Sequence, residues 1–168
     1  MPKIIENLES KLIEEAHKQV EQLGYGGVTI RSVAKACGVG VGTVYNYFPS
    51  KDDLLATYLL GDWKNCMAAI NSVSKQADSP APVIHFMFDQ LLSYAKRHQT
   101  IFCDDAASAN FVSAFNRYHG LLRAQLAVPV RKFCSSDFMA EFIAESLLTW
   151  SMSGKTCDEI YEILKKLF

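Results

Sequence analysis

The 168-residue sequence has no apolar run long enough to span a bilayer, so we expect no membrane segment. The acidic first helix does not resemble a signal peptide. The five cysteines are odd in number and show no paired metal-ligand spacing, which predicts reduced thiols in a cytoplasmic protein and no metal centre. The formal net charge of −1 argues against a non-specific nucleic-acid coat protein but allows a specific DNA-binding protein with clustered cations.

The sequence also lacks the motifs of an enzyme. Its four histidines are scattered and form no HExxH motif. The glycine-rich segment Gly38–Gly42 has no strand before it and no Lys-Ser/Thr pair after it, which argues against a Walker-type nucleotide loop. Asp104 and Asp105 are adjacent and would point about 100° apart on a helix, which does not favour a shared proton. Glu141 and Glu145 lie one helical turn apart and could bind a cation, mark a solvent edge or contact another subunit. We predict no enzymatic activity and no cofactor.

No segment alternates between apolar and polar residues, so no β-sheet is predicted, and apolar residues recur at helical spacing along the chain. A first long helix should stop at the glycine-rich segment Gly24–Gly27. Another should begin at Ser50, with Asp53 as its capping partner, and extend to about Ser74. Further helical segments are expected at residues 80–98, 100–106, 111–129 and 135–152, and a last one from residue 156 onward. The sequence therefore predicts an all-α fold.

The segment from Thr29 to Lys51 is the most informative part of the chain. Thr29 is an N-cap residue type before an apolar helical run, and Gly38 stands where a helix end favours positive φ. A second short helix is predicted from about Val41 to Tyr47, and Pro49 prevents its continuation. The segment contains no acidic residue. Two short helices, a tight turn and an anion-tolerant surface are typical of a helix-turn-helix, which lays its second helix in the DNA major groove.

The sequence GYGGVTIRSVAKACGVGVGTVYNYFPSKDDLL, Gly24 to Leu55, resembles the TetR family of bacterial transcriptional regulators. The resemblance implies a three-helix DNA-binding domain, which we assign to residues 1–49, followed by a helical effector-binding and dimerisation domain at residues 50–168. The helix expected at residues 50–74 begins at this boundary and connects the two domains. Family members often have a serine cap and a lysine at the start of the recognition helix, where this chain has Gly40 and Val41. Strong guanine readout is therefore not expected there.

The residues predicted to contact DNA include one group that faces the phosphate backbone. Phosphate contacts position a protein on the duplex, whereas base contacts select the sequence. Thr29 at a helix N-terminus offers a hydroxyl and backbone N–H groups to an oxyanion. The resemblance implies that Thr43, Tyr47 and Lys51 also contact the backbone. Gly42 is expected to let the helix approach the DNA closely.

Base contacts are predicted for a second group of side chains, Thr43, Tyr45 and Asn46. Asparagine can form two hydrogen bonds with adenine, and threonine or tyrosine can contact a thymine methyl group. Arg31 is the candidate for contacting guanine. Two alternatives stay open, because Tyr45 could pack within the small domain and Asn46 could only face solvent.

The last two predicted helices carry more apolar residues than a single packing partner would cover, which monomers seldom tolerate. Two such helices from each of two copies would form a four-helix interface, and the resemblance implies the same two-fold dimer. The predicted interface residues are Phe142, Leu147, Trp150, Ile160, Leu164 and Leu167. A dimer would set its recognition helices about 34–36 Å apart and favour a near-palindromic DNA site.

Aromatic and methionine side chains are concentrated in the middle of the chain, where core packing is the simplest interpretation. The resemblance implies that some of them line a pocket for a small molecule that repositions the DNA-reading helices. The candidate pocket residues are Trp63, Met67, Met87, Phe88, Phe111, Phe115 and Tyr118. Because they include little charge, we expect a mainly apolar or aromatic effector. The chain is short for the family, so its cavity could be small or unused.

The residues and the resemblance together predict a homodimeric, cytoplasmic regulator that binds double-stranded operator DNA. Family analogy favours a repressor over an activator. Two alternatives stay open: a DNA-binding protein that acts through protein partners without an effector, and an enzyme built on the helical second half.

Overall fold

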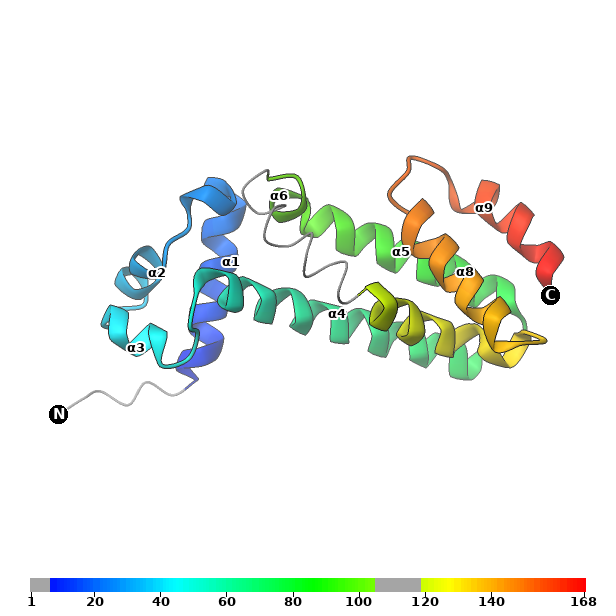
Figure 1. The fold of residues 1–168 in the computed structure, drawn as a ribbon, viewed down its shortest axis with the longest axis horizontal. Helices are drawn as coiled ribbons and strands as arrows, with labels where there is room; N and C mark the ends of the chain where they lie inside the picture. Colours follow the sequence, from blue (N-terminus) through cyan, green and yellow to red (C-terminus); the bar gives the residue numbers. More distant parts are fainter. Residues whose placement is uncertain (1–6, 105–118) are drawn as a thin grey trace. The chain divides into compact units, whose positions relative to one another are not determined.

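The computed structural model describes residues 7–104 and 119–168, and every regular element within these ranges is a helix (Figure 1). The labelled α-helices are α1 (Leu8–Gly27), α2 (Ile30–Ala36), α3 (Val41–Tyr45), α4 (Lys51–Gln76), α5 (Pro80–Arg97), α6 (Gln99–Phe102), α8 (Asp137–Trp150) and α9 (Cys157–Leu164). Residues 119–130 are also helical, and short 3-10 turns span Arg131–Phe133 and Lys165–Leu167. The predicted all-α class is confirmed. Among the described residues, no helix combines the length and the hydropathy required to traverse a bilayer.

Two compact units share the described chain, and the division falls inside α4. The first unit ends at Asp62 and also includes α6, whereas the second begins at Trp63 and includes α5, α8 and α9. The boundary predicted between residues 49 and 50 would divide a DNA-binding domain from an effector-binding and dimerisation domain. It stays a prediction.

The first unit surrounds an apolar core formed by α1, α2, α3 and the beginning of α4. Helix α2 packs against both α1 and α3, and α6 packs against α1 (Figure 1). The most deeply buried side chains of this core include Leu12, Ala16, Val33, Val44, Leu54 and Leu55. Gly24, with φ 71° and ψ 173°, interrupts the helical backbone of α1. The glycine-rich stop predicted for the first helix is therefore confirmed.

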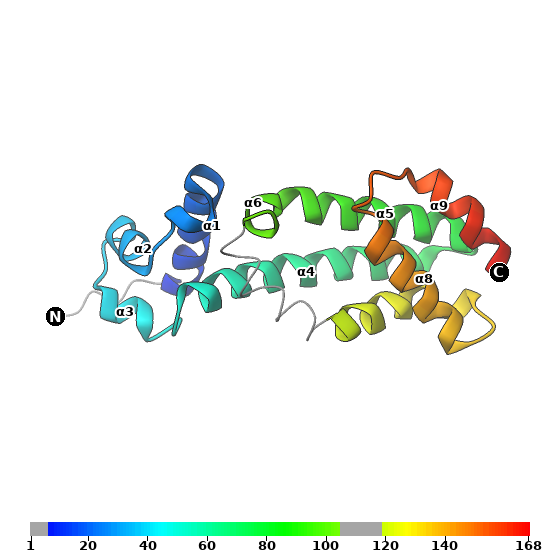
Figure 2. The ribbon, with the colours of Figure 1, turned by 45° about the horizontal axis from the view of Figure 1, so that its top comes forward.

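In the second unit α8 and α9 both pack against α5 (Figure 1 and Figure 2). Its deepest core residues include Ile70, Ile84, Met87, Leu126, Ile143 and Leu147. Helix α8 begins after Ser136, whose hydroxyl accepts a hydrogen bond from the Met139 N–H at 3.2 Å. At the end of α4, Lys132 Nζ donates to the carbonyl oxygens of Ser74 at 2.6 Å and Ala77 at 2.7 Å. A cation at this position satisfies carbonyl groups that the helix itself leaves without donors.

The turn between α2 and α3 depends on Gly38, which has a φ of 68°. Its N–H donates to the Lys35 carbonyl at 3.2 Å, and the Val39 N–H donates to the Ala34 carbonyl at 3.0 Å. These two bonds close the end of α2 as in a Schellman-type cap, which requires a residue that tolerates positive φ. The turn sets the direction in which α3 leaves α2.

Gly38→Ala should lower the free energy of unfolding by about 1 kcal/mol, because a side chain disfavours positive φ. The added Cβ would meet no atom within 4 Å, so the effect reports backbone conformation alone. Urea denaturation followed by circular dichroism measures the change. The control is Gly61→Ala within α4, where φ is not positive and a Cβ also meets no atom, so alanine should stabilise by about 0.5–1 kcal/mol. Effects of the same sign at both positions would contradict the assigned turn.

Candidate DNA-binding site

Helix α3 turns one side toward the core of the first unit. Val44 is 0% exposed, and Phe48, just beyond the end of the helix, is 3% exposed. Val41 is half-buried and packs against the same core. Gly40 precedes the helix and provides no side-chain cap. A helix of five residues is not stable in isolation, so these core contacts keep α3 in place.

The opposite side of α3 and the two residues that follow the helix face solvent, and we define the α3 face as Gly42, Tyr45, Asn46 and Tyr47. Tyr45 is 52% exposed and Tyr47 is 46% exposed, and the other two residues are exposed as well. Thr43 is half-buried beside this face. A Cβ placed on Gly42 would meet no atom within 4 Å, so the backbone here is open to an approaching molecule. Four of the predicted DNA-contacting residues are thus exposed on or directly after α3, and their contact with DNA stays a prediction.

The neighbouring helix α2 carries two positively charged side chains. Arg31 and Lys35 are both exposed on α2, one helical turn apart. The segment between Gln22 and Lys51 contains no acidic residue. A phosphate backbone would therefore meet only positive or neutral side chains in this segment.

The start of α2 is fixed by a closed capping box. Thr29 Oγ1 accepts the Ser32 N–H at 2.9 Å, and Ser32 Oγ accepts the Thr29 N–H at 3.1 Å. Ser32 Oγ also lies 2.6 Å from Oε1 of buried Gln19, whose amide donates to Glu15 Oε1 at 2.8 Å. The predicted cap at Thr29 is confirmed, and its exposed hydroxyl can still donate a hydrogen bond to an anion. Sequence reasoning missed Gln19, because a glutamine on α1 gives no sign of a partner on another helix.

Lys51 does not extend freely into solvent. Its Nζ donates to the Tyr25 carbonyl at 3.0 Å and lies 3.7 Å from the centroid of the Tyr25 ring. The Tyr25 hydroxyl in turn donates to the Asp52 carboxylate. A cation over an aromatic face is attracted to it. These contacts join the glycine-rich corner after α1 to the start of α4. The phosphate contact predicted for Lys51 stays a prediction, but the ammonium already has partners within the unit.

A second exposed surface lies on α8 and α9, around a groove of about 500 Å³. The residues that line this groove are Phe142, Ser146, Trp150, Lys155, Glu159, Ile160, Ile163 and Leu164. Phe142 is 48% exposed, Trp150 49% and Ile163 67%. Exposed apolar surface of this kind is typical of sites that bind another protein, a ligand or a membrane.

Three residues predicted for the subunit interface belong to the core of the second unit. Leu147, Ile160 and Leu164 are 0%, 7% and 2% exposed. Ile160 and Leu164 also line the groove, so their contact with a second copy stays a prediction, whereas the fully buried Leu147 presents no surface to a partner. The exposed apolar residue of α9 is Ile163, which the sequence analysis did not assign to the interface. Leu167 is partly buried against the same core.

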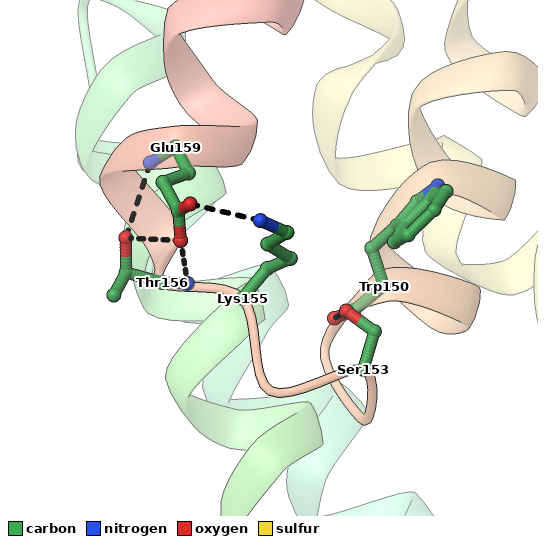
Figure 3. Close-up of polar contacts among 5 residues, drawn as sticks. All are labelled: Trp150, Ser153, Lys155, Thr156 and Glu159. Atoms are coloured by element: carbon green, nitrogen blue, oxygen red, sulfur yellow. Dashed lines mark hydrogen bonds and ion pairs between the residues drawn. The ribbon is translucent and has the colours of Figure 1, made fainter.

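The corner between α8 and α9 is organised by local hydrogen bonds (Figure 3). Thr156 Oγ1 accepts the Glu159 N–H at 3.2 Å, and Glu159 Oε2 accepts the Thr156 N–H at 2.8 Å. The Thr156 N–H, followed by a hydrogen bond from Lys155, lowers the pKa of the Glu159 carboxyl. The Ser153 hydroxyl donates to the Trp150 carbonyl at 2.6 Å. Trp150 therefore adjoins a well-defined turn at the edge of the groove.

The candidate effector residues that the structure describes lie in the core of the second unit. Trp63, Met67, Met87 and Phe88 are all buried, with at most 9% exposed. Trp63 Nε1 donates to Gln125 Oε1 at 2.6 Å, which satisfies its only polar atom. The other candidates, Phe111, Phe115 and Tyr118, lie outside the described residues. A ligand pocket among these side chains stays a prediction.

Glu141 and Glu145 on α8 face a cation of the protein itself. Arg123 Nε lies 3.6 Å from Glu141 Oε2, and Arg123 Nη1 lies 3.7 Å from Glu145 Oε2. His119 Nε2 lies 3.5 Å from Glu145 Oε1. Within residues 7–104 and 119–168, no group of three or more His, Cys, Asp or Glu side chains is arranged to bind a metal ion.

Comparison with known proteins links these features to one family. A family model described as "Bacterial regulatory proteins, tetR family" matches residues 12–58, which include the capping box, the Gly38 turn and the α3 face. The chain is 35% identical over 72 residues to an uncharacterized HTH-type transcriptional regulator of Bacillus subtilis, YuxN, in a match that covers 43% of this chain and 25% of that protein. It is 26% identical over 160 residues to an HTH-type transcriptional regulator of Staphylococcus aureus, covering 90% and 85% of the two chains.

Solved structures show the same fold. Thermus thermophilus FadR, a TetR family transcriptional repressor in complex with lauroyl-CoA, matches with a TM-score of 0.65 and 19% identity. The match covers 95% of this chain and 92% of that one. The family model confirms the resemblance noted in the sequence.

Lys51→Ala should lower the free energy of unfolding by roughly 1 kcal/mol, because it removes a cation–π contact and a hydrogen bond. Denaturant unfolding measures this loss. Lys64→Ala, at an exposed position of α4, is the matched control and should change stability by less than about 0.5 kcal/mol.

The same Lys51 variant also tests DNA contact. If the ammonium neutralises a phosphate when bound, the slope of log affinity against log salt concentration should fall by about one. Fluorescence anisotropy at several salt concentrations measures the slope. An unchanged slope would leave Lys51 with a structural role only.

Proposed function

The chain belongs to the tetR family of bacterial regulatory proteins, and we propose that it is a homodimeric repressor released from operator DNA by a small, mainly apolar effector. It is a DNA-binding transcriptional regulator of the helix-turn-helix type. Because bacterial DNA lies in the cytoplasm, the regulator acts there. Its role requires binding and release rather than turnover of a substrate.

The observation that supports this proposal most directly is the α3 face. Burial of Val44 and Phe48 leaves Tyr45 and Asn46 on the outside of the second helix of a helix-turn-helix. In this motif, residues of the second helix reach base edges in the major groove. The exposed aromatic and amide groups on and just after α3, together with the exposed cations Arg31 and Lys35 on α2, fit DNA binding better than a purely structural role.

Contacts with phosphate would come from around the α3 face. Arg31 and Lys35 provide positive charge on α2, and Thr29 and Tyr47 provide exposed hydroxyls. Such contacts fix the register of the protein on the duplex but carry little sequence information. Base selection then depends on the few side chains that the α3 face and Arg31 offer.

Dimerisation is proposed through α8 and α9. The groove edged by Phe142, Trp150 and Ile163 exposes apolar surface that a second copy of the same two helices would cover. A two-fold interface uses the same patch on both subunits, so a single self-complementary surface is sufficient. Two DNA-binding units related in this way favour a near-palindromic operator.

An apolar effector is proposed from the character of the second unit. Its core is rich in aromatic and methionine side chains, and methionine adapts to ligands of different shape. The related FadR structure contains lauroyl-CoA, a molecule with a long apolar chain. For release, the effector must bind the DNA-free arrangement more tightly than the DNA-bound one, because equal affinity for both shifts nothing.

Asn46→Ala should weaken binding to the selected operator by roughly 1–3 kcal/mol and have much less effect on random DNA, because it removes a base contact rather than a phosphate contact. Fluorescence anisotropy with both duplexes measures the difference. Asn65→Ala, an exposed asparagine on α4 in the second unit, is the matched control and should leave both affinities unchanged. Equal losses on the two duplexes would show that Asn46 does not contact bases.

Ile163→Glu should convert the dimer to a monomer, since a charge in the groove would be buried without a partner on association. Sedimentation velocity measures the oligomeric state. Because Ile163 is 67% exposed, the fold of one protomer should be retained. Leu60→Glu makes the same change at an apolar residue of α4 that is 53% exposed, and this variant should remain dimeric. A dimeric Ile163→Glu variant would place the interface elsewhere.

A further inference from the structure

The α3 face contains no charged side chain. Between Thr29 and Ser50 the only charged residues are Arg31 and Lys35, and both lie on α2. The face itself offers aromatic rings from Tyr45 and Tyr47 and one amide from Asn46. Gly42 adds only backbone, with open space around its Cα.

These groups match some base edges and not others. In the major groove guanine presents two acceptors, which arginine or lysine contacts best. Adenine presents one acceptor and one donor, which pair with an asparagine amide, and thymine presents a methyl group suited to apolar or aromatic contact. The α3 face can therefore recognise adenine and thymine well, whereas it has no cation for guanine.

Helix α2 has the complementary composition. Arg31 is exposed near its start and can donate two hydrogen bonds to one guanine, while Lys35 follows one turn later on the same side. Guanine recognition, where it occurs, is thus restricted to the bases near α2.

We propose that α3 selects an A·T-rich core in each operator half-site, through thymine methyl contacts of Tyr45 and an adenine contact of Asn46. Guanine is confined to the position contacted by Arg31. This inference rests on the proposed function, because it assumes that α3 enters the major groove. The proposal specifies the base composition of the operator. It also makes recognition depend on thymine methyl groups, which can be removed from the duplex without breaking a base pair.

The test begins with the full-length dimer and a random duplex library, from which bound fragments are selected and sequenced. Each thymine of the selected half-site is then replaced in turn by deoxyuridine, which removes only the methyl group. We expect an A·T-rich core and at least one deoxyuridine substitution that weakens binding roughly fourfold, the loss expected for one buried methyl. The same substitution should have no effect on the affinity of Tyr45→Ala, because the contact is then already absent.

Asn46→Arg provides a gain-of-contact test. The position is exposed, so the fold accommodates a longer side chain there, and circular dichroism checks this. An arginine in place of the adenine-contacting asparagine should shift the selected core toward guanine. Asn65→Arg, at an exposed position of α4, is the control and should leave the selected sequence unchanged.

The possible results distinguish failure of the A·T-rich core from failure of the proposed DNA-binding function. A sequence-specific protein that selects a G·C-rich core, ignores the loss of thymine methyls, or keeps its A·T core in Asn46→Arg would overturn the inference and leave the DNA-binding regulator intact. A selection that yields no preferred sequence would overturn both.

Discussion

Burial of Val44 and Phe48 determines which side of α3 is available to another molecule. The helix has only five residues and no side-chain cap, so its rotation about its axis is set by packing rather than by its own hydrogen bonds. With Val44 pointing into the core, helical geometry directs Gly42, Tyr45 and Asn46 outward together. The accessible chemistry of the DNA-binding unit therefore follows from two apolar side chains that never touch DNA.

Polar contacts also help to hold the helices of the first unit in place. At one end of the helix-turn-helix, the capping box of Thr29 is tied through Ser32 to buried Gln19 on α1. At the other end, Lys51 and Tyr25 join the corner after α1 to the start of α4. Both connections lie within the first unit. Buried or partly buried polar contacts of this kind favour one arrangement over neighbouring ones, because shifting a helix would leave donors and acceptors unsatisfied.

Local signals made most of the fold predictable from the sequence. Glycine at positive φ, N-cap residues and proline act over a few residues, so Gly38, Thr29 and the Thr156 capping box could all be assigned correctly. Assignments that depend on tertiary contacts were less successful. Leu147 was predicted at the subunit interface but is buried in its own protomer, because an apolar stripe does not reveal which neighbour covers it. The partner of Lys51 is a carbonyl oxygen far away in sequence, which no residue pattern indicates.

The helix-turn-helix of the first unit is thus held in place at its start by the contacts of Thr29 and at its end by those of Lys51. These contacts restrict how an effector could regulate DNA binding in the proposed mechanism. Remodelling α3 would require exposure of Val44 or rupture of the contacts at Thr29 and Lys51, each of which lowers stability. The candidate effector residues that the structure describes all belong to the core of the second unit and include none of these groups. Displacing the first unit as a rigid body preserves all of these contacts. We therefore expect an effector to change the distance and orientation between the two α3 faces of a dimer. The base contacts that each face can form should stay the same.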